Sequence, residues 1–87
     1  MTDDNLLRLR HEISAVDREI FAAVNRRLEL VAELKRHKDA HGIAFLDPDR
    51  ERRIVEERVS ENPGPLSDAG VRSFYIELLA LMKRELG

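Results

Sequence analysis

A seven-residue repeat in the first half of the sequence constrains the fold more than any other feature. Two sets of positions, three residues apart, carry mostly apolar side chains. The first set is Leu6, Ile13, Ile20, Arg27 and Leu34, and the second is Leu9, Val16, Ala23, Leu30 and His37. This spacing predicts a helix from about residue 4 to residue 40 with one apolar stripe along it. Gly42 follows the last repeat and is suited to end such a helix.

This helix is too long for the rest of the chain to cover. A helix of 36 residues spans roughly 54 Å, whereas a compact domain of this length is only roughly 30 Å across. The sequence has 87 residues and no cysteine, so disulfides cannot make up for a small core. We therefore expect a second copy of the chain to cover the stripe in a symmetric homodimer.

Two shorter helices are expected after the long one. Asp47-Pro48 has the residue types preferred at a helix N-cap and first turn, which predicts a helix over about 48–60. The segment 62–65, Asn-Pro-Gly-Pro, separates it from a third helix over about 67–86 with Ser67 as its candidate cap. No segment has the alternation of a strand. The sequence thus predicts an all-α fold of three helices in a single domain over residues 1–87.

Composition excludes several function classes. The net charge is -2, so we expect no nucleic-acid partner, and no apolar run approaches the ~18 residues of a membrane span. The acidic N-terminus lacks an apolar signal region, which favours a cytoplasmic protein. The sequence has no phosphate-binding loop or nucleophile triad. The three histidines lack metal-ligand spacing, so we expect no metal site.

Some basic residues of the long helix lie at positions where a solvent-exposed surface role does not explain them. Arg27 occupies a stripe position, where a guanidinium is costly unless paired, so it is either a structural ion pair or an anion clamp. Lys38 lies 11 residues further on and points in nearly the same direction, roughly 16 Å away. The two could bracket a small dianion, unless Lys38 caps the helix C-terminus. Arg10 points about 100° away from Arg27 and is either a surface residue or a donor to a partner's pocket.

The start of the second helix gathers further polar groups. Asp47, Arg50 and Glu51 lie within one turn of free backbone N–H groups, which can bind a hydroxyl or a carboxylate. The alternative is a capped helix start with a local ion pair.

Four segments of the first two expected helices form a recognisable pattern. They are the Leu-rich residues 6–17 with Arg10, the residues 25–31 (Asn-Arg-Arg-Leu-Glu-Leu-Val), Lys38, and the residues 47–52 (Asp-Pro-Asp-Arg-Glu-Arg). In this order and at these separations they resemble the all-helical class of chorismate mutases. The resemblance covers about residues 5 to 60 well and the third helix in pattern only.

The resemblance implies an intertwined homodimer that converts chorismate to prephenate, a Claisen rearrangement on the route to phenylalanine and tyrosine. It implies that Arg27 binds one substrate carboxylate and that Arg10 from the other subunit binds the second. Lys38 would hydrogen-bond the ether oxygen and help to hold a carboxylate. The remaining implied residues share the start of the second helix, where they would position the ring hydroxyl and line the site: Asp47, Glu51 and Arg50. A pericyclic step of this kind needs no cofactor, and we expect none.

The third helix departs from the family pattern. The family places a small polar residue there and, one turn later, a Gln or Glu that hydrogen-bonds the ether oxygen. Alignment on Tyr75, which we favour, puts Met82 and Leu86 at these positions and removes that hydrogen bond. A slip by one residue puts Leu81 and Glu85 there, and Glu85 would then have to be protonated to donate.

Three other functions stay open on the same sequence. The cationic pocket would also suit an isochorismate-pyruvate lyase or a mutase for an amino analogue of chorismate. A non-catalytic helical dimerisation or regulatory module would use Arg27 and Lys38 structurally. Because the third helix departs from the family pattern, we also expect that a partner enzyme could activate the protein.

Overall fold

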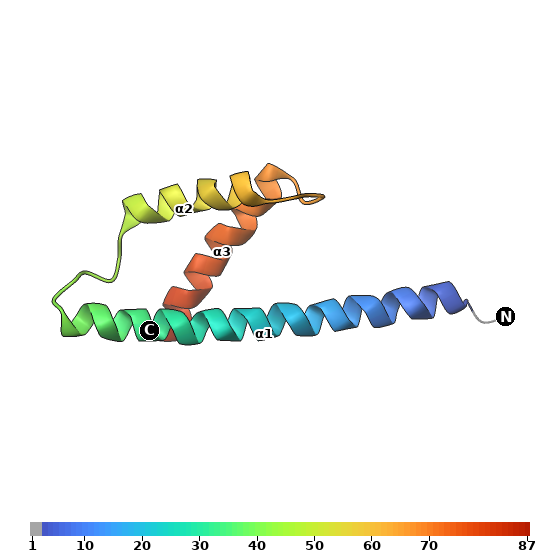
Figure 1. The fold of residues 1–87 in the computed structure, drawn as a ribbon, viewed down its shortest axis with the longest axis horizontal. Coiled ribbons are helices and arrows are strands. Elements are labelled where there is room, and N and C mark those ends of the chain that lie inside the picture. The colour runs from blue at the N-terminus through green and yellow to red at the C-terminus, as the bar shows by residue number, and fades with distance from the viewer. Residues whose placement is uncertain (1–2) are drawn as a thin grey trace. The chain divides into compact units, whose positions relative to one another are not determined.

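The computed structural model describes residues 3–87 and contains three helices in this part of the chain (Figure 1). They are α1 (Asp4–Ala40), α2 (Pro48–Glu61) and α3 (Asp68–Leu86). The described residues form no strand, so the predicted all-α fold with a very long first helix is confirmed. The chain divides into two compact units, Met1–Glu33 and Leu34–Gly87.

The first unit consists of most of α1, which carries its apolar stripe on the surface. None of the described residues of α1 is buried. Along the stripe, Leu6, Leu9, Ile13, Val16 and Ile20 are between 42% and 60% exposed. Exposure of so much aliphatic surface to water is unfavourable, so α1 has a face that needs a covering partner.

The C-terminal end of α1 turns sharply at a glycine. Gly42 has a φ of 65°. Glycine adopts this left-handed conformation with little strain because it has no Cβ. The Ile43 N–H donates to the Lys38 carbonyl at 2.8 Å, and the Gly42 N–H donates to the Asp39 carbonyl at 3.4 Å. This pair of hydrogen bonds is a Schellman motif, and it fixes the direction in which the chain leaves α1.

The starts of α2 and α3 are both capped as the sequence predicts. Asp47 is the N-cap of α2, and its Oδ1 accepts a hydrogen bond from the Arg50 N–H at 3.1 Å. Pro48 follows as the first helical residue, where its missing N–H costs nothing. Ser67 is the N-cap of α3, and its Oγ accepts from the Gly70 N–H at 3.0 Å. These caps satisfy donors that each helix start leaves without a backbone partner.

Within the second unit, α2 packs against α3 around a small apolar core. The buried side chains are Val55 from α2 and Val71, Tyr75 and Met82 from α3, each less than 9% exposed. The Arg58 guanidinium carbon lies 5.7 Å from the centre of the Tyr75 ring, which closes one edge of this core with a cation–π contact. Four buried side chains give this pair of helices a fixed relative position.

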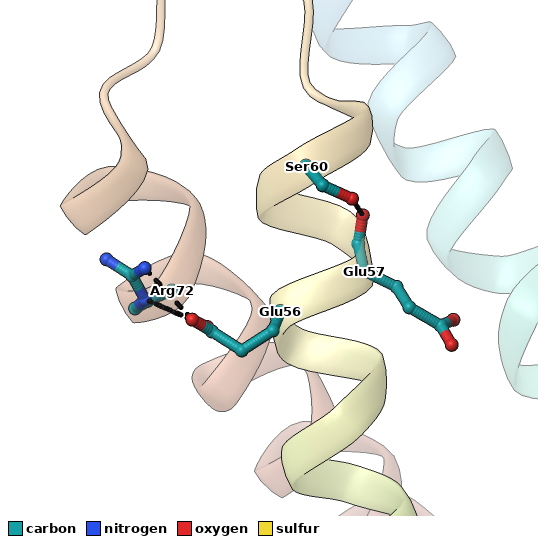
Figure 2. A network of polar contacts seen from close by, with 4 residues as sticks. All are labelled: Glu56, Glu57, Ser60 and Arg72. Carbon is teal, nitrogen blue, oxygen red and sulfur yellow. Dashed lines mark hydrogen bonds and ion pairs between the residues drawn. The ribbon is translucent and has the colours of Figure 1, made fainter.

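An ion pair joins α2 to α3 near the turn between them (Figure 2). Arg72 donates from Nε to Glu56 Oε2 at 2.9 Å and from Nη2 to Glu56 Oε1 at 3.0 Å. These hydrogen bonds hold the pKa of the Glu56 carboxyl below its ordinary value. Glu56 thus stays ionised at pH values where an ordinary glutamate begins to protonate. On the same helix, the Ser60 hydroxyl donates to the Glu57 carbonyl at 2.8 Å.

Candidate active site

The start of α2 has the polar geometry that the sequence predicts. Asp47 uses its side chain to cap the Arg50 N–H, and its own carbonyl accepts from the Glu51 N–H at 3.0 Å. Arg50 is exposed, whereas Glu51 is half-buried. The first turn therefore presents two carboxylates and a guanidinium, and the carboxylate oxygens can accept a hydrogen bond from a hydroxyl group.

Lys38 is held against the segment that leads into α2. Its Nζ donates to the Phe45 carbonyl at 3.3 Å and lies 5.9 Å from the centre of the Phe45 ring. The Lys38 carbonyl also accepts the Schellman hydrogen bond from Ile43. Phe45 precedes the Asp47 cap by two residues. The Lys38 ammonium therefore lies beside the segment that immediately precedes α2. The ammonium donates outside α1, which differs from the alternative in which Lys38 caps its own helix.

Glu51 has a partner on α3 that the sequence analysis missed. Lys83 Nζ lies 2.8 Å from Glu51 Oε1 and donates to Oε2 at 3.0 Å. The two side chains are 32% and 42% exposed, with Glu51 the less exposed. Glu51 is thus paired between helices, with a cation 32 residues further along the chain. A local ion pair is also present at the start of α2, where Arg52 pairs with Asp49.

A groove of about 560 Å³ lies between α2 and α3, with Glu51 and Lys83 among its walls. Most of its surface is apolar, and its charged lining residues come from both helices. Its lining comes from both helices: Pro48, Glu51, Arg52, Val55 and Glu56 of α2, and Ile76, Leu79, Ala80 and Lys83 of α3.

The six predicted site residues fall into two sets. Lys38, Asp47, Arg50 and Glu51 belong to the unit Leu34–Gly87. The last three lie at the start of α2, and Lys38 binds the Phe45 carbonyl in the segment just before it. The two arginines of α1, Arg10 and Arg27, belong to the other unit, Met1–Glu33. Their part in the site rests on the motif pattern.

On α3, the burial pattern favours the alignment based on Tyr75. Met82 is 3% exposed and belongs to the core, and Leu86 is half-buried. In the alternative alignment, Leu81 is half-buried and Glu85 is exposed. The inward face of α3 thus carries Met82 and Leu86, and which residues of α3 face a substrate stays a prediction.

Residues 3–87 contain neither a cluster of metal-binding side chains nor a membrane-spanning helix. Across these residues, no group of three or more His, Asp or Glu side chains is arranged to hold a metal ion. His37 and His41 stack with ring centres 4.2 Å apart, and the His41 Nδ1 lies 2.8 Å from the His37 carbonyl. None of the helices in this range is long and apolar enough to cross a membrane.

Comparison with known proteins identifies relatives over nearly the whole chain. Residues 9–85 match the family model for chorismate mutase type II. A 4-amino-4-deoxychorismate mutase of Streptomyces venezuelae is 32% identical over 99% of this chain and 82% of its own length. The T-protein of Haemophilus influenzae is 35% identical over 79% of this chain, which corresponds to 17% of the T-protein.

Solved structures of the same fold come from Thermus thermophilus. Form I of its chorismate mutase has a TM-score of 0.86 at 32% identity, covering 90% of this chain and 98% of that one. Form II has a TM-score of 0.88 at 30% identity, covering 94% of this chain and 93% of that one. Both agree with the three-helix architecture described above.

Proposed function

We propose that this chain acts on chorismate as a homodimer and that six of its residues form the substrate site. The chain belongs to the chorismate mutase type II family and is an isomerase of that family. The observation that supports this proposal is that Asp47, Arg50 and Glu51 share the start of α2 while Lys38 binds the Phe45 carbonyl just before it. Arg10 and Arg27 complete the set on α1.

The reaction needs the substrate to be folded and held. Chorismate is a dianion, and its rearrangement to prephenate breaks a C–O bond while a C–C bond forms in the same step. We assign one carboxylate to Arg27 and the other to Arg10 of the second subunit, since guanidinium groups bind carboxylates in bidentate geometry. Holding both ends brings the two reacting carbons together and lowers the entropic part of the barrier.

The breaking C–O bond gathers negative charge on the ether oxygen in the transition state. We assign Lys38 to this oxygen, because a fixed ammonium favours the polarised transition state over the ground state. The hydrogen bond to the Phe45 carbonyl limits the motion of the ammonium before substrate binds. Asp47 and Glu51 are assigned to the ring hydroxyl, and Arg50 to the wall of the site.

The exposed stripe of α1 supports the proposed dimer. A partner's α1 is the simplest cover for five aliphatic side chains that are 42% to 60% exposed. The same arrangement supplies Arg10 to the second subunit's site. We also propose that the protein acts in the cytoplasm.

The proposal is tested by adding the purified protein to chorismate and following the loss of chorismate absorbance with the product identified. The expected product is prephenate, formed without added metal or cofactor. Absence of chorismate turnover, with isochorismate or the amino analogue consumed instead, would replace this function by a lyase or an amino-substrate mutase. Inertness toward all three substrates would favour the non-catalytic module.

The amino-substrate mutase is the second candidate. The observation in its favour is the similarity to the Streptomyces venezuelae protein over 99% of this chain. The same cationic set would hold that substrate's carboxylates, so the two functions differ only at the ring substituent. Activation by a partner enzyme is a further proposal, and a rate unchanged by added enzymes of the same pathway would argue against it.

Leu86→Gln should raise kcat for chorismate about tenfold, since one hydrogen bond to developing charge contributes about 1.5–3 kcal/mol. Leu86 is half-buried on the inward face of α3, where the family has a hydrogen-bond donor. Steady-state kinetics at constant pH provide the measurement. The matched control is Glu85→Gln on the exposed neighbour, which should leave both rate and pH profile unchanged. Increased activity of wild type at acid pH, lost in Glu85→Gln, would contradict this alignment.

A further inference from the structure

The carboxylate of Glu51 already has a cation beside it before any substrate binds. Lys83 contacts both of its oxygens, at 2.8 Å and 3.0 Å. We propose that Lys83 determines specificity: by neutralising Glu51 it selects a ring hydroxyl and disfavours a ring ammonium. This inference rests on the proposed function, in which Glu51 faces the ring substituent.

The two substituents differ in charge at neutral pH. An aliphatic amine is protonated at pH 7, whereas a hydroxyl is neutral. An ionised carboxylate has about four lone-pair positions, so Glu51 can accept from Lys83 and from a hydroxyl at the same time. An ammonium on the ring would instead lie within a few ångströms of the Lys83 ammonium. Like charges at that distance repel, and the attraction to Glu51 is already offset.

Neighbouring charges do not replace Lys83 at this position. Glu56 lines the same groove, but Arg72 holds both of its oxygens. Arg52 also lines the groove, and its guanidinium pairs with Asp49 in the first turn of α2. The Glu51–Lys83 pair therefore sets the local charge at this end of the groove.

The fold does not depend on this pair. Both side chains are about one-third or more exposed, and ion pairs of such exposure contribute little to stability. The four buried side chains fix α2 against α3, and Arg72–Glu56 joins the same two helices at their other end (Figure 2). Loss of the Lys83 charge should thus change substrate choice and leave the helices in place.

The test compares kcat/KM for chorismate and for 4-amino-4-deoxychorismate at pH 7. Wild type should prefer chorismate. Lys83→Met, which keeps the length and removes the charge, should shift the ratio toward the amine about tenfold, mainly through a lower KM for the amine. Lys83→Arg should restore the wild-type ratio. Arg72→Met, which removes the other ion pair between the helices, should leave the ratio unchanged.

Two results would overturn the inference and leave the proposed function intact. One is a ratio unchanged by Lys83→Met in a protein whose helix content by circular dichroism equals that of wild type. The other is a wild type that prefers the amine. A wild type that converts neither substrate would overturn the proposed function together with the inference.

Discussion

Arg27→Ala is expected to lower kcat/KM for chorismate by about a hundredfold or more, with the dimer retained. Removal of one charged donor from a preorganised site costs about this much in other enzymes. Arg27 lies on the apolar stripe of α1, a position that an aliphatic side chain would normally occupy. If its role is to hold a substrate carboxylate, its truncation removes binding and orientation and leaves the fold in place. Steady-state kinetics and sedimentation velocity on the same sample provide both measurements.

The neighbouring residue offers a matched control for this experiment. Arg26 carries the same charge on the same turn, but its side chain is 67% exposed and pairs with Glu29 at 3.3 Å. Arg26→Ala should therefore retain wild-type activity. A structural role for Arg27 would give the opposite pattern, with dissociation of the dimer in Arg27→Ala and activity that returns at high protein concentration.

Mixed dimers are expected to show that Arg10 acts across the subunit boundary. Arg10→Ala and Arg27→Ala homodimers should each be nearly inactive. A mixed dimer of the two variants, isolated by two different affinity tags, should recover about half of the wild-type activity. The reason is that one of its two sites combines Arg27 of one chain with Arg10 of the other, and the second site lacks both.

The reciprocal mixed dimer separates the two possible arrangements. It pairs a wild-type chain with a chain that carries both substitutions. If Arg10 acts in trans, each site lacks one arginine and the dimer is inactive. If Arg10 serves its own subunit, the wild-type chain keeps a complete site and about half of the activity remains. Activity in this dimer, together with inactivity in the first, would contradict donation across the interface.

The helical part of the fold could be read from the sequence because local rules decide it. A seven-residue repeat without proline or glycine specifies one long helix, and α1 extends over Asp4–Ala40. Asp47-Pro48 and Ser67 mark the starts of α2 and α3 through caps that involve only neighbouring residues. Each of these signals lies within a few residues of the boundary it sets.

The partner of Glu51 could not be read in the same way, because its position depends on how α2 packs against α3. Lys83 lies 32 residues away, and no local motif links the two. A weak signal was nevertheless present. Glu56 and Arg72 carry opposite charges at similar distances from the turn at residues 62–67, and Glu51 and Lys83 do so at larger and less equal distances. Two such pairs indicate helices that run antiparallel from that turn.

The absence of buried side chains on α1 has a consequence for the order of folding. α2 and α3 are joined by residues 62–67 and bury their shared core within one chain, so their docking is a first-order step. In the proposed homodimer, the stripe of α1 is covered on collision with a second chain, and that step is second-order in protein. Refolding should thus show an early phase whose rate is independent of protein concentration and a later phase whose rate rises with protein concentration. The longest helix would then be the last to reach its final packing.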